Sequence, residues 1–456
     1  MKIKKTYYII TIGCQMNKSD SERIAAYLEG CGYGLAKNET RASLVVLTTC
    51  GVRQAAEDRV YGLVNNIKKK NPKVKLILTG CLSEREDVKR RLGDKVDLWL
   101  PIGKLPNVKI LMTNQIKSSN VKCRDYLKIK PKYSSNFSAF VPIGNGCNNF
   151  CAYCVVPYAR GREVYRPVKE ILAEVKDLVA RGYKEVILIA QNVNSYNSRI
   201  TNYELRIKNK FQNPKSKKIN FSGLLKLVNA ISGDFWIRFA TSHPKDMSDE
   251  LIKTVAEGSN PPSSRLRRAR VCKHIHLPVQ AGDDGVLKKM NRNYTVAHYK
   301  NLIKKIRKAM PGASITTDVI VGFPGETKKQ FSNTVKLFKE VKFDMAYIAR
   351  YSPRPGTEAY KLKDDVLPEE KKRREEELMK ILRRTALENN RKYLGKTVEV
   401  LVAGKDRQGD FYGYTETNKN TRIMNYELGI KNIIGKFVKV KITKAKDFGL
   451  EGIYTN

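Results

Sequence analysis

Three cysteines lie within eight residues, in the stretch GCNNFCAYCVVPYARGR from Gly146 to Arg162. Cys147, Cys151 and Cys154 have the spacing C-x3-C-x2-C, and no histidine lies nearby. Zinc usually takes four closed nitrogen or sulfur ligands, and no fourth ligand follows at a zinc-finger spacing. A four-iron four-sulfur cluster has one ligand site per iron, so three thiolates leave one iron open to bind a substrate. The spacing therefore favours such a cluster over a chance run of buried cysteines.

Three further cysteines close three similar apolar runs near the start of the chain. The runs YYIITIGC, SLVVLTTC and VKLILTGC end at Cys14, Cys50 and Cys81. Each is short and rich in β-branched residues, as strands are, and helix-like stretches separate them. This alternation predicts parallel strands, whose carboxyl ends meet at one edge of a sheet. We therefore expect the three thiols to hold a second cluster, with three metal-free strand-end cysteines as the alternative.

Residues 1–120 are accordingly predicted to form an N-terminal parallel α/β domain. Its first helix is expected to begin at Ser19, with Glu22 three residues on in a capping-box pattern. Its second helix should run from about Val52 to Lys70 and end at an Asn-Pro pair. Residues near 105–136 are polar and weakly patterned, which indicates a linker.

Residues 133–385 alternate strand-like and helix-like segments, a repeat that over roughly 250 residues indicates a full or partial β/α barrel. Each strand-like run leads into a polar loop, and amphipathic helices such as Lys329–Glu340 separate the runs. Functional residues of such a barrel lie where the strands end. His243 and His276 lie at two of these ends, and we expect them to be structural or to position substrate rather than to bind metal.

The sequence pattern changes after a charged helical run from about Pro368 to Lys392. Residues 391–456 contain short alternating strands punctuated by glycine and asparagine, which predicts a small five-stranded β-barrel. This segment holds 13 lysine and arginine residues and 7 acidic ones, a net charge of +6. The predicted fold is therefore α/β, with a parallel α/β domain, a central barrel and a terminal β-barrel.

The overall charge points to a polyanionic partner. The chain carries 87 lysine and arginine residues and 45 acidic ones, a net charge of +42. Such a charge favours binding to RNA, DNA or an acidic membrane, with a merely solvated basic surface as the alternative. Residues 197–220 and 260–273 hold seven and five basic residues, and both stretches are predicted to be surface loops.

No run approaches the ~18 apolar residues of a membrane span, and the basic start of the chain leads into a strand-like segment. We therefore expect a cytoplasmic protein that does not bind membrane, in which thiols stay reduced and serve metal binding or catalysis. Cys31, Cys123 and Cys272 fall outside both triads and are interpreted as structural.

The C-x3-C-x2-C spacing is the signature of the radical SAM enzymes, and the chain resembles that superfamily at this motif. The resemblance implies that S-adenosylmethionine binds the open iron and is cleaved to a 5′-deoxyadenosyl radical. The runs AQNVNSY, HLPVQAGDD and DVIVGFPGET resemble the loops that contact this cofactor. The expected cofactor contacts are Tyr153, Gln191, Gln280, Asp318, Gly322 and Phe323.

Further landmarks extend the resemblance over essentially the whole chain. The stretches GCQMNKSDSE, TTCGVRQAAEDRVYG, LTGCLSERE, TSHPKDMSDELI and HLPVQAGDDGVLKKMNRNYT resemble the radical SAM methylthiotransferases, and GCQMN resembles their MiaB type. The terminal β-barrel resembles the TRAM domain, an RNA-binding module. The resemblance implies two 4Fe–4S clusters, with metal-binding and catalytic roles for Cys14, Cys50, Cys81, Cys147, Cys151 and Cys154.

The implied activity is addition of a methylthio group to C2 of N6-isopentenyladenosine at position 37 of tRNA. The implied partners are the anticodon loop of tRNA, an electron donor such as flavodoxin or ferredoxin, and a sulfur source, with the protein acting as a monomer. Within the family, threonylcarbamoyl-adenosine in tRNA and an aspartate of a ribosomal protein are alternative substrates. A non-catalytic RNA-binding iron–sulfur protein is the alternative from another class.

Overall fold

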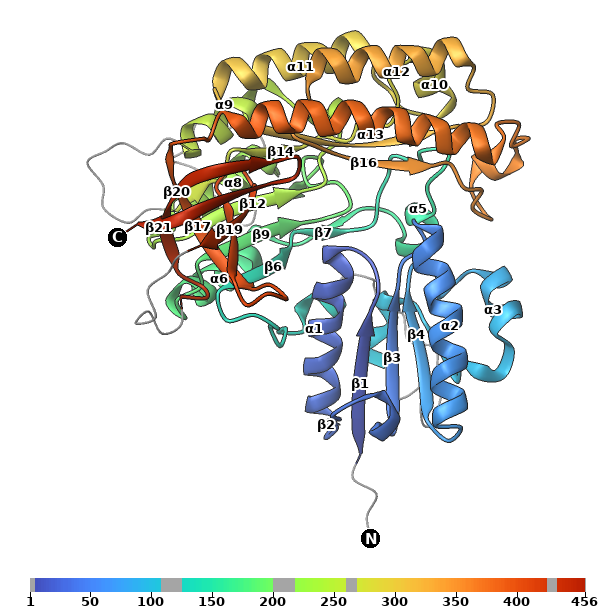
Figure 1. The fold of residues 1–456 in the computed structure, drawn as a ribbon. Helices are drawn as coiled ribbons and strands as arrows, with labels where there is room; N and C mark the ends of the chain where they lie inside the picture. The colour runs from blue at the N-terminus through green and yellow to red at the C-terminus, as the bar shows by residue number, and fades with distance from the viewer. Residues whose placement is uncertain (1–4, 108–124, 200–217, 260–268, 425–432, 456) are drawn as a thin grey trace.

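The computed structural model describes residues 5–107, 125–199, 218–259, 269–424 and 433–455. Figure 1 shows three bodies along the chain: an α/β domain in blue, a central domain from green to orange, and a small β-structure in red. Most of the two basic stretches lies outside the described residues, as does Cys123. None of the described helices is long and apolar enough to span a membrane.

The N-terminal domain is a parallel sheet with the strand order β2-β1-β3-β4-β5, which confirms the predicted class. Strand β3 is buried along its whole length because helices cover both faces of the sheet. Tyr126 and Leu127, from the expected linker, also pack into this core. The elements are β1 (Thr6–Thr11), α1 (Gln15–Gly30), β2 (Gly34–Leu35), β3 (Leu44–Thr49), α2 (Gln54–Lys70), β4 (Lys75–Gly80), α3 (Glu86–Leu92) and β5 (Leu98–Leu100).

Helix α1 begins directly after Cys14, so the start predicted at Ser19 is wrong. Gly13, whose φ is 124°, turns the chain from β1 straight into the helix. Ser19 and Glu22 therefore lie inside the helix and are buried. The Glu22 carboxylate accepts hydrogen bonds from the backbone N–H and the hydroxyl of Ser134. Glu22 of the apparent capping box thus serves the contact with the central domain, whereas Ser19 accepts a hydrogen bond from Arg23 within the helix.

The central domain is a partial barrel, the second of the two forms that the sequence predicted. Its parallel strands form two sheets, β6-β9-β12-β13 and β14-β15-β16, and helices pack against their outer faces. Among the described strands none joins β16 to β6, so the barrel stays open on that side. The strands are β6 (Ser138–Pro142), β9 (Glu185–Ile189), β12 (Trp236–Ala240), β13 (Arg270–Val271), β14 (His274–His276), β15 (Ser314–Val321) and β16 (Met345–Arg350).

Helices and short hairpins complete the central domain, and α10, α11 and α12 lie above the strands in Figure 1. Helix α12 matches the helix predicted there within one residue at each end. The helices are α5 (Val156–Arg160), α6 (Val168–Ala180), α8 (Phe221–Asn229), α9 (Asp249–Ser259), α10 (Asp284–Lys289), α11 (Val296–Ala309) and α12 (Lys328–Val341). The hairpins pair β7 (Gly144–Asn145) with β8 (Val164–Tyr165) and β10 (Asn197–Arg199) with β11 (Lys218–Asn220).

The C-terminal segment forms the predicted five-stranded β-barrel, closed in the order β17-β18-β19-β21-β20. Helix α13 (Pro368–Arg391) crosses the central domain and leads into it. Alternate residues of its longest strand are buried and exposed, as expected for a barrel filled by its own side chains. The strands are β17 (Thr397–Lys405), β18 (Phe411–Thr415), β19 (Asn420–Met424), β20 (Phe437–Lys446) and β21 (Gly449–Thr455).

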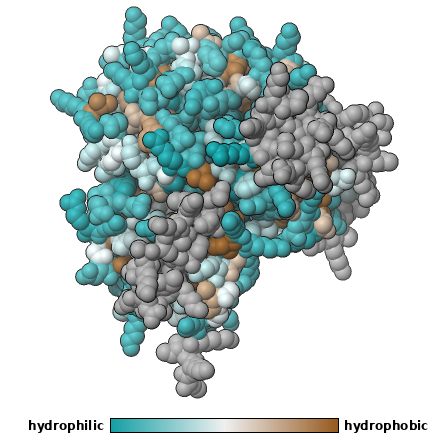
Figure 2. All heavy atoms as spheres, turned by 180° about the vertical axis from the view of Figure 1, so that it is seen from behind, coloured by the Kyte–Doolittle hydropathy of each residue, from teal (hydrophilic) through white to brown (hydrophobic). Residues whose placement is uncertain are grey.

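The small barrel closes the amino-terminal end of the central barrel. Trp236, the first residue of β12, packs on Phe437 with ring centroids 4.8 Å apart. The buried guanidinium of Arg238 donates to the carbonyl oxygens of Thr415 and Glu416, at 2.7 and 3.1 Å. The carboxyl-terminal end of the central strands is thereby left to the N-terminal domain. Figure 2 shows the opposite view, in which hydrophilic side chains dominate and hydrophobic ones form small separate patches.

Candidate active site

The barrel cysteines lie on a loop that a tight hairpin holds in place. Gly146 has a φ of 84°, and a Cβ there would lie 2.2 Å from the carbonyl oxygen of Arg162. Only glycine therefore lets β7 and β8 approach so closely. The backbone N–H groups of Cys147 and Cys154 donate to the carbonyl oxygens of Gly161 and Cys151, at 3.1 and 2.9 Å. These contacts fix the backbone on both sides of the cysteines.

The three N-terminal cysteines converge at one edge of their sheet, as their strand-end positions predicted. A Cβ added to Gly13, next to Cys14, would lie 2.7 Å from the Cβ of Cys50. A Cβ added to Gly51 would lie 3.3 Å from the Cβ of Cys81. Cys14 is exposed, whereas the other two thiols are buried. The loops after β1, β3 and β4 therefore bring the three thiols together.

The two triads face each other across the boundary between the domains. Burial raises the pKa of the Cys154 thiol above its usual range, and the thiolates of Cys151, Cys147 and Cys81 raise it further. Cys81 belongs to the N-terminal triad, so its charge reaches the barrel triad. Burial likewise raises the pKa of Cys147, to about 11. Such thiols ionise readily only beside positive charge, which cluster irons supply.

Arg160 lies between the triads and was not singled out from the sequence. It is buried, and its Nη2 donates to Oδ2 of Asp20 at 2.6 Å and to Oδ1 of Asn17 at 2.8 Å. Burial raises the pKa of Cys81, while the positive charge of Arg160 opposes that rise. Arg160 lies six residues after Cys154, which could have marked it as a neighbour of the barrel triad. The spacing does not show that Arg160 also contacts the N-terminal domain.

Arg292 has the same relation to the barrel triad. Its Nη1 donates to Sγ of Cys151 at 3.6 Å, and its Nη2 donates to the carbonyl oxygen of Pro278 at 2.6 Å. Burial raises the pKa of Tyr153, and the thiolates of Cys151 and Cys154 add to that effect. The predicted contact residue Tyr153 thus lies beside two barrel thiols. Arg292 is far from the cysteines in sequence, so the sequence alone did not indicate that it contacts them.

Buried polar atoms without partners gather at the strand ends where cofactor contacts were predicted. Within the described residues, Oε1 of Gln191, Oγ of Ser242 and Nε2 of His243 have no hydrogen-bond partner. Burial, together with the charges of Arg292 and Lys245, lowers the pKa of His243 to about 2, so its ring is neutral. Buried polar groups normally have partners. These residues therefore fit a polar ligand such as the amino acid and ribose groups of S-adenosylmethionine.

The other predicted contacts lie around β15. Gln280 has a φ of 69°, and its backbone N–H donates to the carbonyl oxygen of Asp318 at 2.9 Å. The carboxylate of Asp318 lies 3.4 Å from Nε2 of His276 on the inner face of the barrel. Gln280 forms an isolated parallel bridge with Val319, so it lies beside the strand that carries Asp318. Cofactor contacts by Gln280 and Asp318 stay predictions.

Gly322 and Phe323 have a packing role in this structure. A Cβ at Gly322 would lie 2.4 Å from Cγ of Lys371, so the close approach there is made by helix α13. The N–H of Gly322 donates to the Glu326 carboxylate at 2.6 Å. Phe323 is fully buried and packs edge-on against Tyr351. The expected adenine contact at these two residues stays a prediction.

No group of histidine, cysteine or acidic side chains in the described ranges is close enough to hold a single metal ion.

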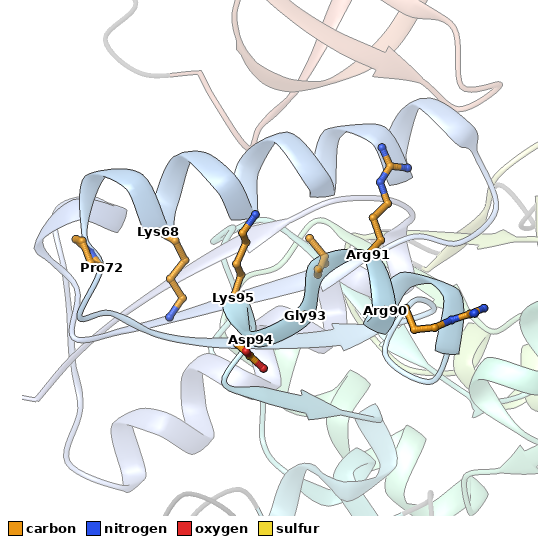
Figure 3. A pocket seen from close by; sticks show the side chains of 8 residues that line it. Lys68, Pro72, Arg90, Arg91, Gly93, Asp94 and Lys95 are labelled. Atoms are coloured by element: carbon orange, nitrogen blue, oxygen red, sulfur yellow. The ribbon is translucent and has the colours of Figure 1, made fainter.

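Figure 3 shows a basic pocket on the N-terminal domain, beside the last turn of α2 and the end of α3. Lys68 pairs with Asp97 at 2.7 Å, and Lys95 donates to Asn65 at 2.8 Å. The guanidinium of Arg91 lies 3.8 Å from the ring centre of Tyr61. The pocket contains no cysteine, so the candidate active site lies elsewhere, at the boundary between the domains.

Comparisons with known families divide the chain in the same way. The Radical SAM superfamily matches residues 141–338, and the TRAM domain matches residues 391–454. The Uncharacterized protein family UPF0004 matches residues 6–100. A solved structure of the radical S-adenosylmethionine methyltransferase TsrM from Kitasatospora setae has a TM-score of 0.50 and 12% identity, covering 78% of this chain and 75% of its own. That likeness concerns the fold alone.

Two relatives match over nearly their full lengths. The tRNA-2-methylthio-N(6)-dimethylallyladenosine synthase of Clostridium novyi (strain NT) is 39% identical over 472 residues, covering 98% of this chain and 96% of its own. The protein of the same name from Carboxydothermus hydrogenoformans is 39% identical and covers 99% of each chain.

The partial barrel and its three-cysteine loop define a radical SAM protein. Enzymes of this superfamily use S-adenosylmethionine and 4Fe–4S clusters. By its identity over the whole length, the chain belongs to the family of the tRNA-2-methylthio-N(6)-dimethylallyladenosine synthases.

Proposed function

We propose that this protein adds a methylthio group to C2 of N6-dimethylallyladenosine, also called N6-isopentenyladenosine, at position 37 of tRNA. One observation carries the proposal: two cysteine triads meet across one domain boundary, where Arg160 of the barrel loop donates to Asp20 at 2.6 Å and to Asn17 at 2.8 Å in the helix that follows Cys14. Two centres that act on the same substrate carbon must lie this close together. The full-length identity to synthases of that name supports the substrate.

The chemistry needs cofactors because C2 of adenine is unactivated and offers nothing to ordinary acid–base catalysis. When bound, S-adenosylmethionine and two 4Fe–4S clusters supply the radical and sulfur-transfer chemistry that side chains lack. In this proposal Cys147, Cys151 and Cys154 hold one cluster. Cys14, Cys50 and Cys81 would hold the other.

The protein itself supplies charge balance and a dry, rigid setting. Arg292 beside Cys151 and Arg160 beside Cys81 place fixed positive charge next to the anionic sulfurs. Both arginines are almost fully buried, so water screens their charge little. Gln191 and His243 offer free polar atoms for orienting the cofactor.

The remaining partners complete the proposal. The net charge of +42 and the TRAM domain suit binding to the phosphates of the tRNA anticodon arm. A single-stranded loop lets the target base leave its stack more cheaply than a duplex would. Reduction requires an electron donor such as flavodoxin or ferredoxin, and catalysis requires a sulfur source. We place the protein in the cytoplasm, acting as a monomer.

The test is nucleoside mass spectrometry of a defined tRNA. Anaerobically reconstituted protein should convert tRNA that carries N6-dimethylallyladenosine into its 2-methylthio form when S-adenosylmethionine, sulfide and a reductant are present. A tRNA with threonylcarbamoyl-adenosine should stay unchanged. Absence of product from the first tRNA, or product only from the second, would contradict the proposed substrate.

A metal analysis accompanies this test and supports the assignment of the cysteines. Wild-type protein should bind about eight irons, four per cluster, and replacing Cys147, Cys151 and Cys154 together by alanine should halve that content. The same triple replacement should abolish formation of 5′-deoxyadenosine. Full iron content in the triple variant would show that these cysteines do not bind a cluster.

A further inference from the structure

One aromatic ring on the inner face of the central barrel is unusually exposed. Tyr347 lies in β16, the last strand of its sheet, and its side chain is 50% exposed. Its neighbour Ala346 is buried in the core beneath the helices. Because successive side chains of a strand point to opposite faces, Tyr347 points into the barrel interior. A large ring left half-exposed there is available to a ligand.

Tyr347 is surrounded by residues from both halves of the active site. It lies opposite Asp318 in the register of β15 and β16, and the His276 ring is edge-on to it, with centroids 6.3 Å apart. From the N-terminal domain, the guanidinium of Arg53 lies 5.7 Å from its ring centre. Arg53 follows Cys50 by three residues. The ring therefore stands between the cofactor-binding strand and the N-terminal cysteines.

The position of Arg53 is itself fixed by the central domain. Arg354, beyond the end of β16, donates from Nη2 to the carbonyl oxygen of Val52 at 3.3 Å and from Nη1 to the Glu57 carboxylate at 3.0 Å. This buried contact ties the segment after Cys50 to the segment after β16. In Figure 1 β16 accordingly lies just above α5 and the start of α2.

We propose that Tyr347, flanked by Arg53, is the stacking platform that holds the target purine base between the two cysteine triads. Every base has a flat aromatic face, and an exposed tyrosine with an adjacent guanidinium is the surface that binds such a face. The inference rests on the proposed function, because a base that reacts with both centres must lie between them. It goes further by naming the residue that binds the base.

The test compares binding of two anticodon stem-loop RNAs, one with N6-dimethylallyladenosine and one with 2-aminopurine at the target position, to the reconstituted protein. Tyr347→Ala should weaken binding of the first RNA roughly 5- to 100-fold, the equivalent of one stacked base. Tyr347→Phe should bind normally, because the ring and not the hydroxyl does the stacking. Stacking should quench 2-aminopurine in wild type and in Tyr347→Phe, but not in Tyr347→Ala.

Phe448 provides a matched control, since it is 37% exposed and has Arg383 at 5.5 Å, on a different surface. Phe448→Ala should leave the quenching unchanged. Normal affinity and quenching in Tyr347→Ala would overturn the platform while leaving the proposed function intact. If the wild-type protein makes no methylthiolated nucleoside but still quenches 2-aminopurine fluorescence, the result would contradict the proposed function and leave the stacking role of Tyr347 intact.

Discussion

At the scale of single residues, the contact between the two triads depends on Arg160. Its guanidinium and the Asp20 carboxylate are each 2% exposed, so neither charge has water to replace its partner. Arg160 also donates to Asn145 on β7, at 3.0 Å, which joins the barrel loop to helix α1. Removal of one member of such a pair leaves an uncompensated buried charge.

Arg160→Met should therefore destabilise the protein by about 3–5 kcal/mol. Asp20→Asn in the same chain should restore part of that loss, because the remaining amide is neutral. Arg373→Met is the control, since its pair with Glu370 is half exposed and worth at most about 1 kcal/mol. Thermal unfolding under anaerobic conditions measures all three, and equal shifts for Arg160→Met and Arg373→Met would contradict the role of the buried pair.

At the scale of elements, the strand ends are shaped by glycines that precede the cysteines. Gly80 ends β4 with a φ of 87°, and a Cβ there would lie 2.5 Å from the carbonyl oxygen of Thr49 on β3. Both the backbone conformation and the space exclude a side chain. The backbone of β4 must shift if a side chain is added. Cys81 is the next residue, so its thiol would move as well.

Gly80→Ala should cost more than the ~1–2 kcal/mol of a left-handed non-glycine residue, and it should lower the iron held by the N-terminal triad. Gly62→Ala is the matched control, because Gly62 lies within α2 and has open space around its Cα. That change should stabilise the protein by up to about 1 kcal/mol through helix propensity. Chemical denaturation and iron analysis give both readouts, and unchanged iron in Gly80→Ala would show that the sheet edge tolerates the shift.

At the scale of the whole molecule, the TRAM domain is part of the central barrel's own structure. Lys419 pairs with Asp344 at 2.6 Å, both almost fully buried, and Arg238 is held by carbonyl oxygens of the same loop. Deletion of residues 391–456 would leave Asp344 without Lys419, remove two of the acceptors of Arg238 and expose Trp236. Such a deletion would therefore unfold the barrel as well as remove an RNA contact, and point changes on the outer surface are the cleaner test.

Lys439 and Lys441 lie on the exposed face of β20. Lys439→Gln with Lys441→Gln should lower the slope of log affinity against log salt by about 0.7–0.9 for each lost phosphate contact. Modified and unmodified tRNA should be affected alike, because phosphate contacts carry no base information. Lys304→Gln with Lys308→Gln on α11 changes the charge equally and should leave the slope unchanged. Equal slopes in both pairs would mean that this face does not touch RNA.

Local patterns in the sequence predicted most of the elements and the thiols that they carry. A β-branched run that ends in Cys14, Cys50 or Cys81 is a local pattern, and parallel strands necessarily bring their carboxyl ends together. The spacing of Cys147, Cys151 and Cys154 is likewise local. For this reason the three domains, the convergence of the N-terminal cysteines and the closed terminal barrel could all be predicted.

Tertiary structure alone decided how the two triads meet and what surrounds them. Arg160 reaches Asp20 across 140 positions of sequence, and Arg292 reaches Cys151 across 141, distances over which no periodicity carries information. The Glu22 side chain that resembled part of a capping box instead accepts hydrogen bonds from Ser134, 112 positions away. In the sequence Tyr347 is an ordinary strand residue. Only the folded structure shows that it lies in the last strand of an open barrel, with Arg53 beside its ring. Long-range packing selects among locally acceptable alternatives, and only the folded chain shows which one prevails.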